Sequence, residues 1–158
     1  MSPPKNTKQF ATNRQARFNY HILDKYVAGI VLRGPEVKSI RGGKLNIKDS
    51  FVRFARSGEL WLINTHVSPY QGGTQASIDP TRKRKLLLTK RELGKLASEA
   101  KAKGLTMVPL AVFDSHGKIK VEIALVKGKK LYDKREDRKQ ADLKREAQRE
   151  AKSINVKF

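Results

Sequence analysis

The sequence predicts a mainly β fold: a small closed antiparallel barrel with flanking helices and a basic C-terminal tail. Three observations support this prediction. Short apolar runs separated by turn residues fill the middle of the chain, and a helix signature precedes the last two runs. The chain has 158 residues, 38% of them hydrophobic, so it can bury a core of its own. It has no cysteine, which excludes disulfides, thiolate metal sites and a cysteine nucleophile.

Four strands are expected in the first half of the folded region. The runs Asn19–Leu23 and Val27–Arg33 are short and apolar, as strands of a small sheet are. The runs Phe51–Arg56 and Glu59–His66 flank Ser57-Gly58. These two turn residues predict a hairpin between the flanking runs.

Two more strands, Leu105–Phe113 and Ile119–Val126, flank the turn residues Asp114–Gly117 and predict a second hairpin. In the last strand, bulky apolar residues alternate with charged or small ones such as Glu122. This period of two predicts one buried face and one face in water. Pro109 cannot donate a ladder hydrogen bond, so its strand is expected to be an edge strand or to carry a bulge.

Two helices are expected, near residues 35–41 and 89–103. The first begins at Gly34-Pro35, where the missing N–H of proline needs no partner. In the second, Thr89 and Glu92 have the spacing of a capping box, and an apolar stripe follows them. Gly104 supplies a left-handed residue after this helix.

This order of elements favours an OB-type barrel, whose closure removes exposed strand edges. A split α+β sandwich is the alternative. We expect residues 1–12 to form a basic flexible arm, residues 13–127 the barrel, and residues 128–158 a basic tail. Because side chains fill a barrel of this size, ligands are expected on its outer face or loops.

The net charge of the chain points to a polyanionic partner. Lys and Arg number 35 against 15 Asp and Glu, a formal net charge of +20. Nucleic acid is the leading candidate, and a membrane surface is a distant second. No apolar run is long enough for a transmembrane helix, and the polar N-terminus lacks the apolar region of a signal peptide. We therefore expect a cytoplasmic protein with no membrane partner.

The densest cationic segment is residues 82–91, in which six of ten residues are Lys or Arg. A solvated helix face is the plain interpretation. Adjacent like charges repel one another, however, so a cluster this dense is better explained by phosphates that neutralise it. Binding of RNA to such a cluster would depend strongly on salt. Reversal of Arg82, Arg84 and Lys85 to Glu is therefore predicted to abolish RNA binding while leaving the fold intact.

Aromatic residues among the charges are a second sign of RNA binding, because unpaired bases stack on such rings. The candidates are Phe18, Tyr20, Tyr26, Tyr70 and Tyr132. The alternative is that Phe18, Tyr26 and also Trp61 belong to the core or its rim.

Nothing in the sequence indicates an enzyme. His21, His66 and His116 are scattered, without the spacing of metal ligands. The acidic residues form no recognisable catalytic motif, and neither a phosphate-binding loop nor a nucleophile elbow is present. No catalytic residue, metal or cofactor is expected.

The tail from residue 128 is rich in Lys, Arg, Glu, Gln and Ala, which favour helix. Its apolar stripe is thin, so a lone helix there is marginal in water. We expect the tail to be disordered in the free protein and to fold in an RNA-lined site. A purely solubilising tail is the alternative.

Several motifs, in order and at matching spacing, resemble the SsrA-binding protein (small protein B) family. The resemblance covers the chain from about Asn13 to Arg135. The motifs that carry it are Asn13-x-x-Ala-x-x-x-Tyr20, Ala28-Gly-Ile, Gly34-x-Glu-Val-Lys-Ser39, Asp49-Ser50, Ser68-Pro-Tyr70, Asp79-Pro-Thr-Arg-x-Arg-Lys-Leu-Leu-Leu88, Arg91-Glu-Leu93 and Gly128-Lys-Lys-x-x-Asp-Lys-Arg135.

The resemblance implies an OB-type barrel that holds the tRNA-like domain of transfer-messenger RNA (tmRNA) and performs no chemistry. It also implies a tail that occupies the empty decoding site and messenger channel of a stalled ribosome. Together with the cationic segment, it gives an RNA-binding set of Asn13, Arg17, Tyr20, Glu36, Lys38, Arg41, Arg82, Arg84, Lys85, Leu87 and Thr89. Glu36 could accept hydrogen bonds from bases, hold a neighbouring Arg, or form a purely structural salt bridge. The implied ribosome-binding set is Gly128, Lys129, Lys130, Tyr132, Asp133, Lys134, Arg135 and Ile154.

Three positions depart from the family pattern. Val27 stands where an acidic residue is usual, Thr89 where Asn is common, and Tyr132 where His is usual. Two rival functions remain at this point: a constitutive ribosomal protein with basic tails, and an RNA-modifying enzyme. A monomer is expected.

Overall fold

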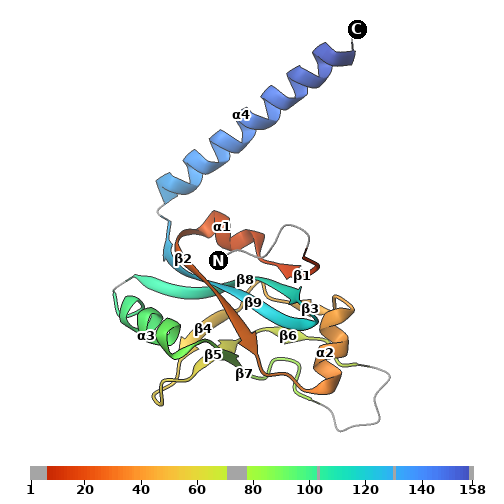
Figure 1. Ribbon diagram of the computed structural model, residues 1–158. Helices are drawn as coiled ribbons and strands as arrows, with labels where there is room; N and C mark the ends of the chain where they lie inside the picture. The colour runs from red at the N-terminus through yellow and green to blue at the C-terminus, as the bar shows by residue number, and fades with distance from the viewer. Residues whose placement is uncertain (1–6, 71–77, 103, 130, 157–158) are drawn as a thin grey trace.

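The computed structural model describes residues 7–70, 78–102, 104–129 and 131–156, with the side chains of residues 131–133 and 152–156 left out. Short helices interrupt a series of strands before one long terminal helix (Figure 1). The elements are β1 (Gln9–Thr12), α1 (Arg14–Asn19), β2 (Tyr20–Ile30), α2 (Gly34–Arg41), β3 (Leu45–Asn46), β4 (Phe51–Phe54), β5 (Leu60–Ile63), β6 (His66–Val67), β7 (Arg84–Leu87), α3 (Lys90–Glu99), β8 (Leu105–Ser115), β9 (Lys118–Gly128) and α4 (Leu131–Val156).

The main sheet is antiparallel and curls back on itself, as the sequence predicts. Its strand order is β1-β8-β4-β5-β7-β2-β9, and β8 also pairs with β9. The β8–β9 and β2–β9 ladders are long, whereas β4 meets β8 only at Val52 and Met107. Strand pairing is therefore extensive between β2, β9 and β8, whereas the barrel is incompletely closed between β4 and β8.

Strand β7 is an element that the sequence analysis did not predict as a strand. Within the cationic segment, Arg84 and Leu86 are buried while Lys85 and Leu87 face outward. This alternation has the period of a strand. Strand β7 joins β5 to β2, so the cationic segment is part of the barrel wall.

The face of β9 that was expected in water is buried. Glu122 and Ala124 are 2% and 1% exposed. Helix α1 covers this face, and its Ala16 packs with Val108, Leu110, Ala124 and Val126 in a second small core. A period of two therefore identifies the strand but does not show whether a helix covers its polar-looking face.

Most of the two runs that were expected as separate strands, Asn19–Leu23 and Val27–Arg33, lies in the single strand β2. The register of β2 shifts between Ile22 and Asp24, and the strand ends at Ile30. Pro109 lies at a bulge, since the register of β8 against β9 shifts between Pro109 and Ala111. It is not in an edge strand, because β8 also pairs with β1 and β4.

The expected N-terminal arm, residues 1–12, ends in ordered structure. Residues 9–12 form β1, which is paired with β8, and residues 1–6 lie outside the described chain. Strand β1 therefore belongs to the sheet.

The two expected helices are confirmed, the second with a shorter range. Helix α3 ends at Glu99, before the expected residue 103, and Gly104 follows with a left-handed φ of 79°. The Thr89 hydroxyl accepts a hydrogen bond from the Glu92 N–H at 3.2 Å, as a capping box requires.

Helix α4 projects away from the barrel (Figure 1). Its first described turns contact α1, where Lys134 and Arg138 lie over the Phe18 ring at 5.9 and 5.1 Å from its centre. The described side chains from 141 to 151 are all exposed. Because this helix buries so little, loss of its structure in the free protein stays a prediction. No helix in the described part of the chain is long and apolar enough to span a membrane.

Candidate nucleic-acid interface

Four of the predicted RNA-binding residues line two surface hollows that share no lining residue. The first, which we call the Leu87 hollow, has a volume of about 400 Å³. It lies where β2, α2 and β7 meet the start of β9. It is lined by Gly29, Ile30, Leu32, Val37, Arg41, Leu87, Gly117, Lys118, Ile119 and Lys120.

The floor of the Leu87 hollow is apolar. Leu87 is 49% exposed, because it occupies an outward position of β7. Gly29 is its partner in the β2–β7 ladder. A Cβ at Gly29 would lie 3.4 Å from the Leu87 Cβ and 3.6 Å from the Lys120 Nζ. The glycine thus keeps this part of the floor open.

The rim of the Leu87 hollow is cationic. The Arg41 guanidinium donates to the Gly117 carbonyl at 2.7 Å and lies 3.4 Å from the Asp114 carboxylate, which fixes it beside the β8–β9 turn. Lys118 and Lys120 complete the rim. The sequence analysis missed both lysines, although their alternation with Ile119 already placed them on one side of β9. An apolar floor with a cationic rim can hold an unstacked base and its phosphates.

Beside this hollow, Glu36, Arg82 and Arg84 form a buried ion cluster. Glu36 is 3% exposed and the Arg84 side chain is fully buried. Arg84 Nε donates to the Glu36 carboxylate at 2.7 Å, and Arg82 pairs with the same carboxylate. The other Arg84 nitrogens donate to the carbonyl oxygens of Thr65, Arg82 and Pro80 at 2.8, 3.1 and 3.1 Å.

The prediction that Glu36 and Arg84 contact RNA directly is therefore wrong for this structure. Both side chains are buried, and Arg84 already donates from all three guanidinium nitrogens to protein oxygens. Of the roles considered for Glu36, two fit the structure: it holds the neighbouring Arg82, and it forms a structural salt bridge with the buried Arg84. Reversal of Arg84 is now expected to disrupt the fold, because a second carboxylate would be buried against Glu36.

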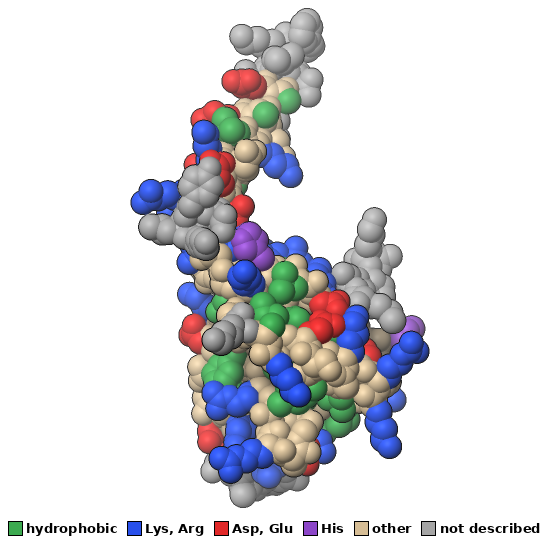
Figure 2. Space-filling view, turned by 90° about the vertical axis from the view of Figure 1, so that its left-hand side faces the viewer, with side chains coloured by type: hydrophobic (Ala, Val, Ile, Leu, Met, Phe, Trp, Pro, Cys, Tyr) green, Lys and Arg blue, Asp and Glu red, His purple; other side chains and the backbone are tan. Residues whose placement is uncertain are grey.

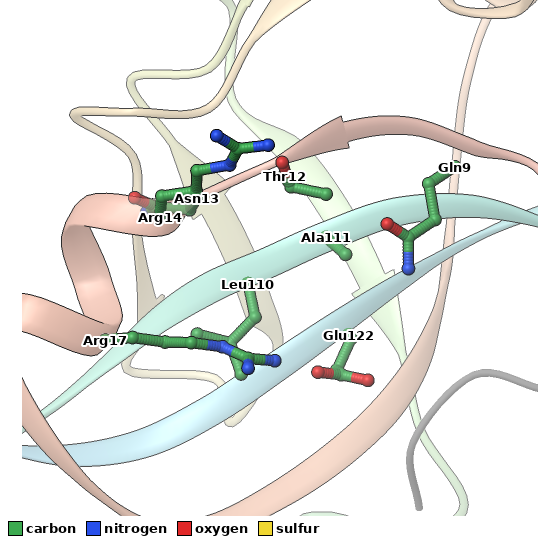
Figure 3. A pocket seen from close by; sticks show the side chains of 8 residues that line it. All are labelled: Gln9, Thr12, Asn13, Arg14, Arg17, Leu110, Ala111 and Glu122. Atoms are coloured by element: carbon green, nitrogen blue, oxygen red, sulfur yellow. The ribbon is translucent and has the colours of Figure 1, made fainter. Parts of the chain in front are cut away.

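The second hollow, which we call the Glu122 hollow, has a volume of about 490 Å³ and lies between α1, β1 and the β8–β9 ladder (Figure 3). It contains Arg17 and Asn13 of the predicted set. Asn13 is 6% exposed and has a structural role: its amide donates to the Pro109 carbonyl at 3.1 Å, and its Oδ1 accepts from the Ala16 N–H at 3.2 Å. Arg17 is exposed.

Comparison with known proteins identifies the family. The family model described as SmpB protein matches residues 10–153. The chain belongs to the SmpB family. It is 54% identical over 145 residues to the SsrA-binding protein of Sulfurihydrogenibium sp., with 92% of this chain and 95% of that protein covered. It is 53% identical over 143 residues to the SsrA-binding protein of Desulforudis audaxviator, with 90% of each covered.

A solved structure shares the fold of this SmpB family member. It is described as "tmRNA-SmpB: a journey to the center of the bacterial ribosome". The match has a TM-score of 0.64 at 49% identity and covers 77% of this chain and 85% of that one.

The remaining predicted RNA-binding residues lie outside both hollows. Lys38 lies 5.1 Å from the centre of the exposed Tyr70 ring, and Lys85 is 3.9 Å from the Glu59 carboxylate. Tyr20 is half-buried against the second core. The Thr89 hydroxyl caps α3, both accepting from and donating to Glu92.

Two residues of the expected SmpB tail precede α4 and contact β2 or α1. Gly128 ends β9, paired with Tyr20. The Lys129 side chain is 10% exposed; its Nζ donates to the Arg17 carbonyl at 3.2 Å and pairs with Asp137. The role of Lys129 in ribosome binding stays a prediction, and in this conformation its ammonium group is paired within the protein. Lys134 and Arg135 lie on α4, whereas Lys130 and the side chains of Tyr132, Asp133 and Ile154 fall outside the described part.

The charge of Glu36 should make the free energy of unfolding depend on pH in the acid range. Burial by itself would raise the pKa of Glu36, but hydrogen bonds from Arg82, the Arg33 N–H and Arg84 outweigh it, so this pKa lies below its ordinary value. Such a carboxyl stabilises the fold above its unfolded pKa of about 4.3. This contribution is lost as the pH falls through the lower, folded pKa.

Urea denaturation across the acid range should therefore show the free energy of unfolding declining below about pH 4.3. We expect Glu36→Gln to flatten this decline, whatever its effect at neutral pH. Glu59→Gln, at a half-exposed carboxylate, is the control that should leave the decline unchanged. An equal slope in the wild type and in Glu36→Gln would contradict the prediction.

Proposed function

We propose that this protein binds tmRNA with its barrel and delivers it to stalled ribosomes for trans-translation. The observation that carries the proposal is the Leu87 hollow, with its apolar floor and three cations, on a chain of the SmpB family. The relatives are named SsrA-binding proteins, and the description of the solved neighbour names tmRNA-SmpB and the bacterial ribosome. These names narrow the RNA partner to tmRNA.

In this proposal the Leu87 hollow holds a nucleotide that is not stacked in a helix. Leu87 offers apolar contact to the face of the base, while Arg41, Lys118 and Lys120 approach the flanking phosphates. Positive side chains elsewhere on the body, several of which are visible in Figure 2, extend this attraction along the RNA. The protein acts by binding and positioning, in the cytoplasm and as a monomer.

Helix α4 has a different role in the proposal. It projects from the barrel, and Arg135 and the other described cations beyond it are exposed. A cationic segment that buries little of its own surface suits a narrow site walled by RNA. We assign it to the empty decoding site and messenger channel of a stalled small subunit.

Reversal of the rim cations tests the binding of tmRNA. The variant Arg41→Glu, Lys118→Glu, Lys120→Glu should lower the affinity for tmRNA by about 100-fold, and the slope of log affinity against log salt should fall by about 3. The reason is that each phosphate contact releases counterions. Filter binding at several salt concentrations measures both quantities, and circular dichroism checks the fold.

The matched control is Lys44→Glu, Arg56→Glu, Lys101→Glu, which makes the same charge change at exposed positions outside the hollow. Equal losses in the two variants would contradict this site. A constitutive ribosomal protein, the rival function, would instead copurify with all small subunits. Sequencing of the RNA that copurifies with the wild-type protein separates these functions.

A further inference from the structure

The Glu122 hollow contains a buried carboxylate at its floor and cations above it. Arg14 and Arg17 of α1 line the hollow together with Gln9 and Thr12, while Leu110, Ala111 and Glu122 come from the β8–β9 ladder. Figure 3 shows the Glu122 carboxylate and the Arg17 guanidinium both pointing into the hollow. Its volume of about 490 Å³ is enough for a small ligand or a nucleobase.

The carboxylate of Glu122 lacks a hydrogen bond that its burial calls for. The residue is 2% exposed, and its Oε2 is buried without a hydrogen-bond partner among the described residues. Buried polar atoms in folded proteins nearly always have a partner. This oxygen therefore marks a position where a donor from outside the chain would fit.

The neighbouring donors do not fill that position. The Asn13 amide is bonded to the Pro109 carbonyl, and no ion pair joins Glu122 to Arg14 or Arg17 within the described part of the chain. The register shift of β8 beside Glu122 interrupts the ladder at this point. The bulge in β8 thus lies beside the Glu122 hollow.

We propose that the Glu122 hollow binds an unpaired guanine of the RNA partner. Guanine presents two adjacent donors, N1–H and N2–H, to the two oxygens of the carboxylate, whereas adenine and uracil present a mixed edge. Arg14 and Arg17 then contact the phosphates on either side of that base. This inference takes from the proposed function only that the partner of the protein is RNA.

An arginine side chain of a protein partner also presents two adjacent donors. The charge of the site disfavours it. Arg14 and Arg17 at the rim, on a chain of net charge +20, repel a cationic peptide but attract the phosphates that flank a neutral guanine.

The test compares short single-stranded RNAs by fluorescence anisotropy with the full-length protein. Labelled oligouridines carry one central guanosine, adenosine or inosine, the last of which lacks the N2 amino group. We expect the wild type to prefer guanosine over adenosine by about tenfold, with inosine in between. Glu122→Gln should remove this preference and leave the affinity for plain oligouridine unchanged.

The matched control is Glu99→Gln, which makes the same charge change on α3 and should keep the preference. Equal wild-type affinity for the guanosine and adenosine probes would overturn the inference without the use of any variant. A preference that persists in a folded Glu122→Gln protein would overturn it too, as would Glu122-dependent binding of arginine amide in its place. In each case retained binding of tmRNA leaves the proposed function standing, whereas failure of the wild type to bind tmRNA contradicts that function itself.

Discussion

Removal of α4 by truncation after Lys129 should abolish rescue of stalled ribosomes and leave the affinity for tmRNA nearly unchanged. The Leu87 hollow and the laddered strands of the barrel all precede this point. The helix contacts the body near Phe18 and through the Lys129–Asp137 ion pair, and its side chains from 137 to 151 are exposed, so its loss removes little stabilising surface. In the sequence analysis the tail begins at residue 128. A truncation after Gly128 would also remove the contact of Lys129 with α1.

Two assays separate the functions of the barrel and the tail. A filter-binding titration measures affinity for tmRNA, and peptidyl transfer on ribosomes whose messenger ends in the decoding site measures rescue. A chain with residues 131–156 replaced by a Gly/Ser segment of equal length is the control for length alone, and it should fail in rescue as well. If truncation weakened RNA binding and rescue equally, α4 would belong to the surface that holds tmRNA.

Replacement of Arg84 by Met should destabilise the fold by about 3–5 kcal/mol, which is the usual cost of removing one partner of a buried ion pair. The change leaves the buried Glu36 carboxylate with Arg82 as its only remaining side-chain partner among the described residues. It also removes donors from the carbonyl oxygens of Thr65 and Pro80. Urea denaturation at neutral pH measures the difference.

Lys85→Met is the matched control, one residue along the same strand. The Lys85 side chain is 41% exposed and its ion pair with Glu59 is long, so its replacement should change stability by no more than about 0.5 kcal/mol. The double variant Arg84→Met, Glu36→Gln should recover part of the loss, because no buried charge is then left uncompensated. Equal stability of the two single variants would contradict the buried cluster.

The sequence alone determined two hairpins, the start of one helix and the character of the partner. The hairpins around Ser57-Gly58 and Asp114–Gly117, and the capping box at Thr89, depend on residues close together in the chain. Turn chemistry and side-chain alternation describe such elements without knowledge of the rest. Net charge is likewise a sum over the chain, so the expectation of a polyanion needed no structure.

Tertiary structure decided which of the charged residues are available to RNA. In the sequence, Arg84 and Lys85 are equivalent neighbours in a cationic run. The first is buried and the second exposed because Glu36, 48 residues before Arg84, and carbonyl oxygens from other loops surround only one of them. In the same way, Glu122 lies under α1 instead of in water, and Lys118 and Lys120 join Arg41 around Leu87. Burial and charge pairing depend on neighbours that only the closing of the sheet brings together, so a local pattern can give the face of a strand but not what covers that face.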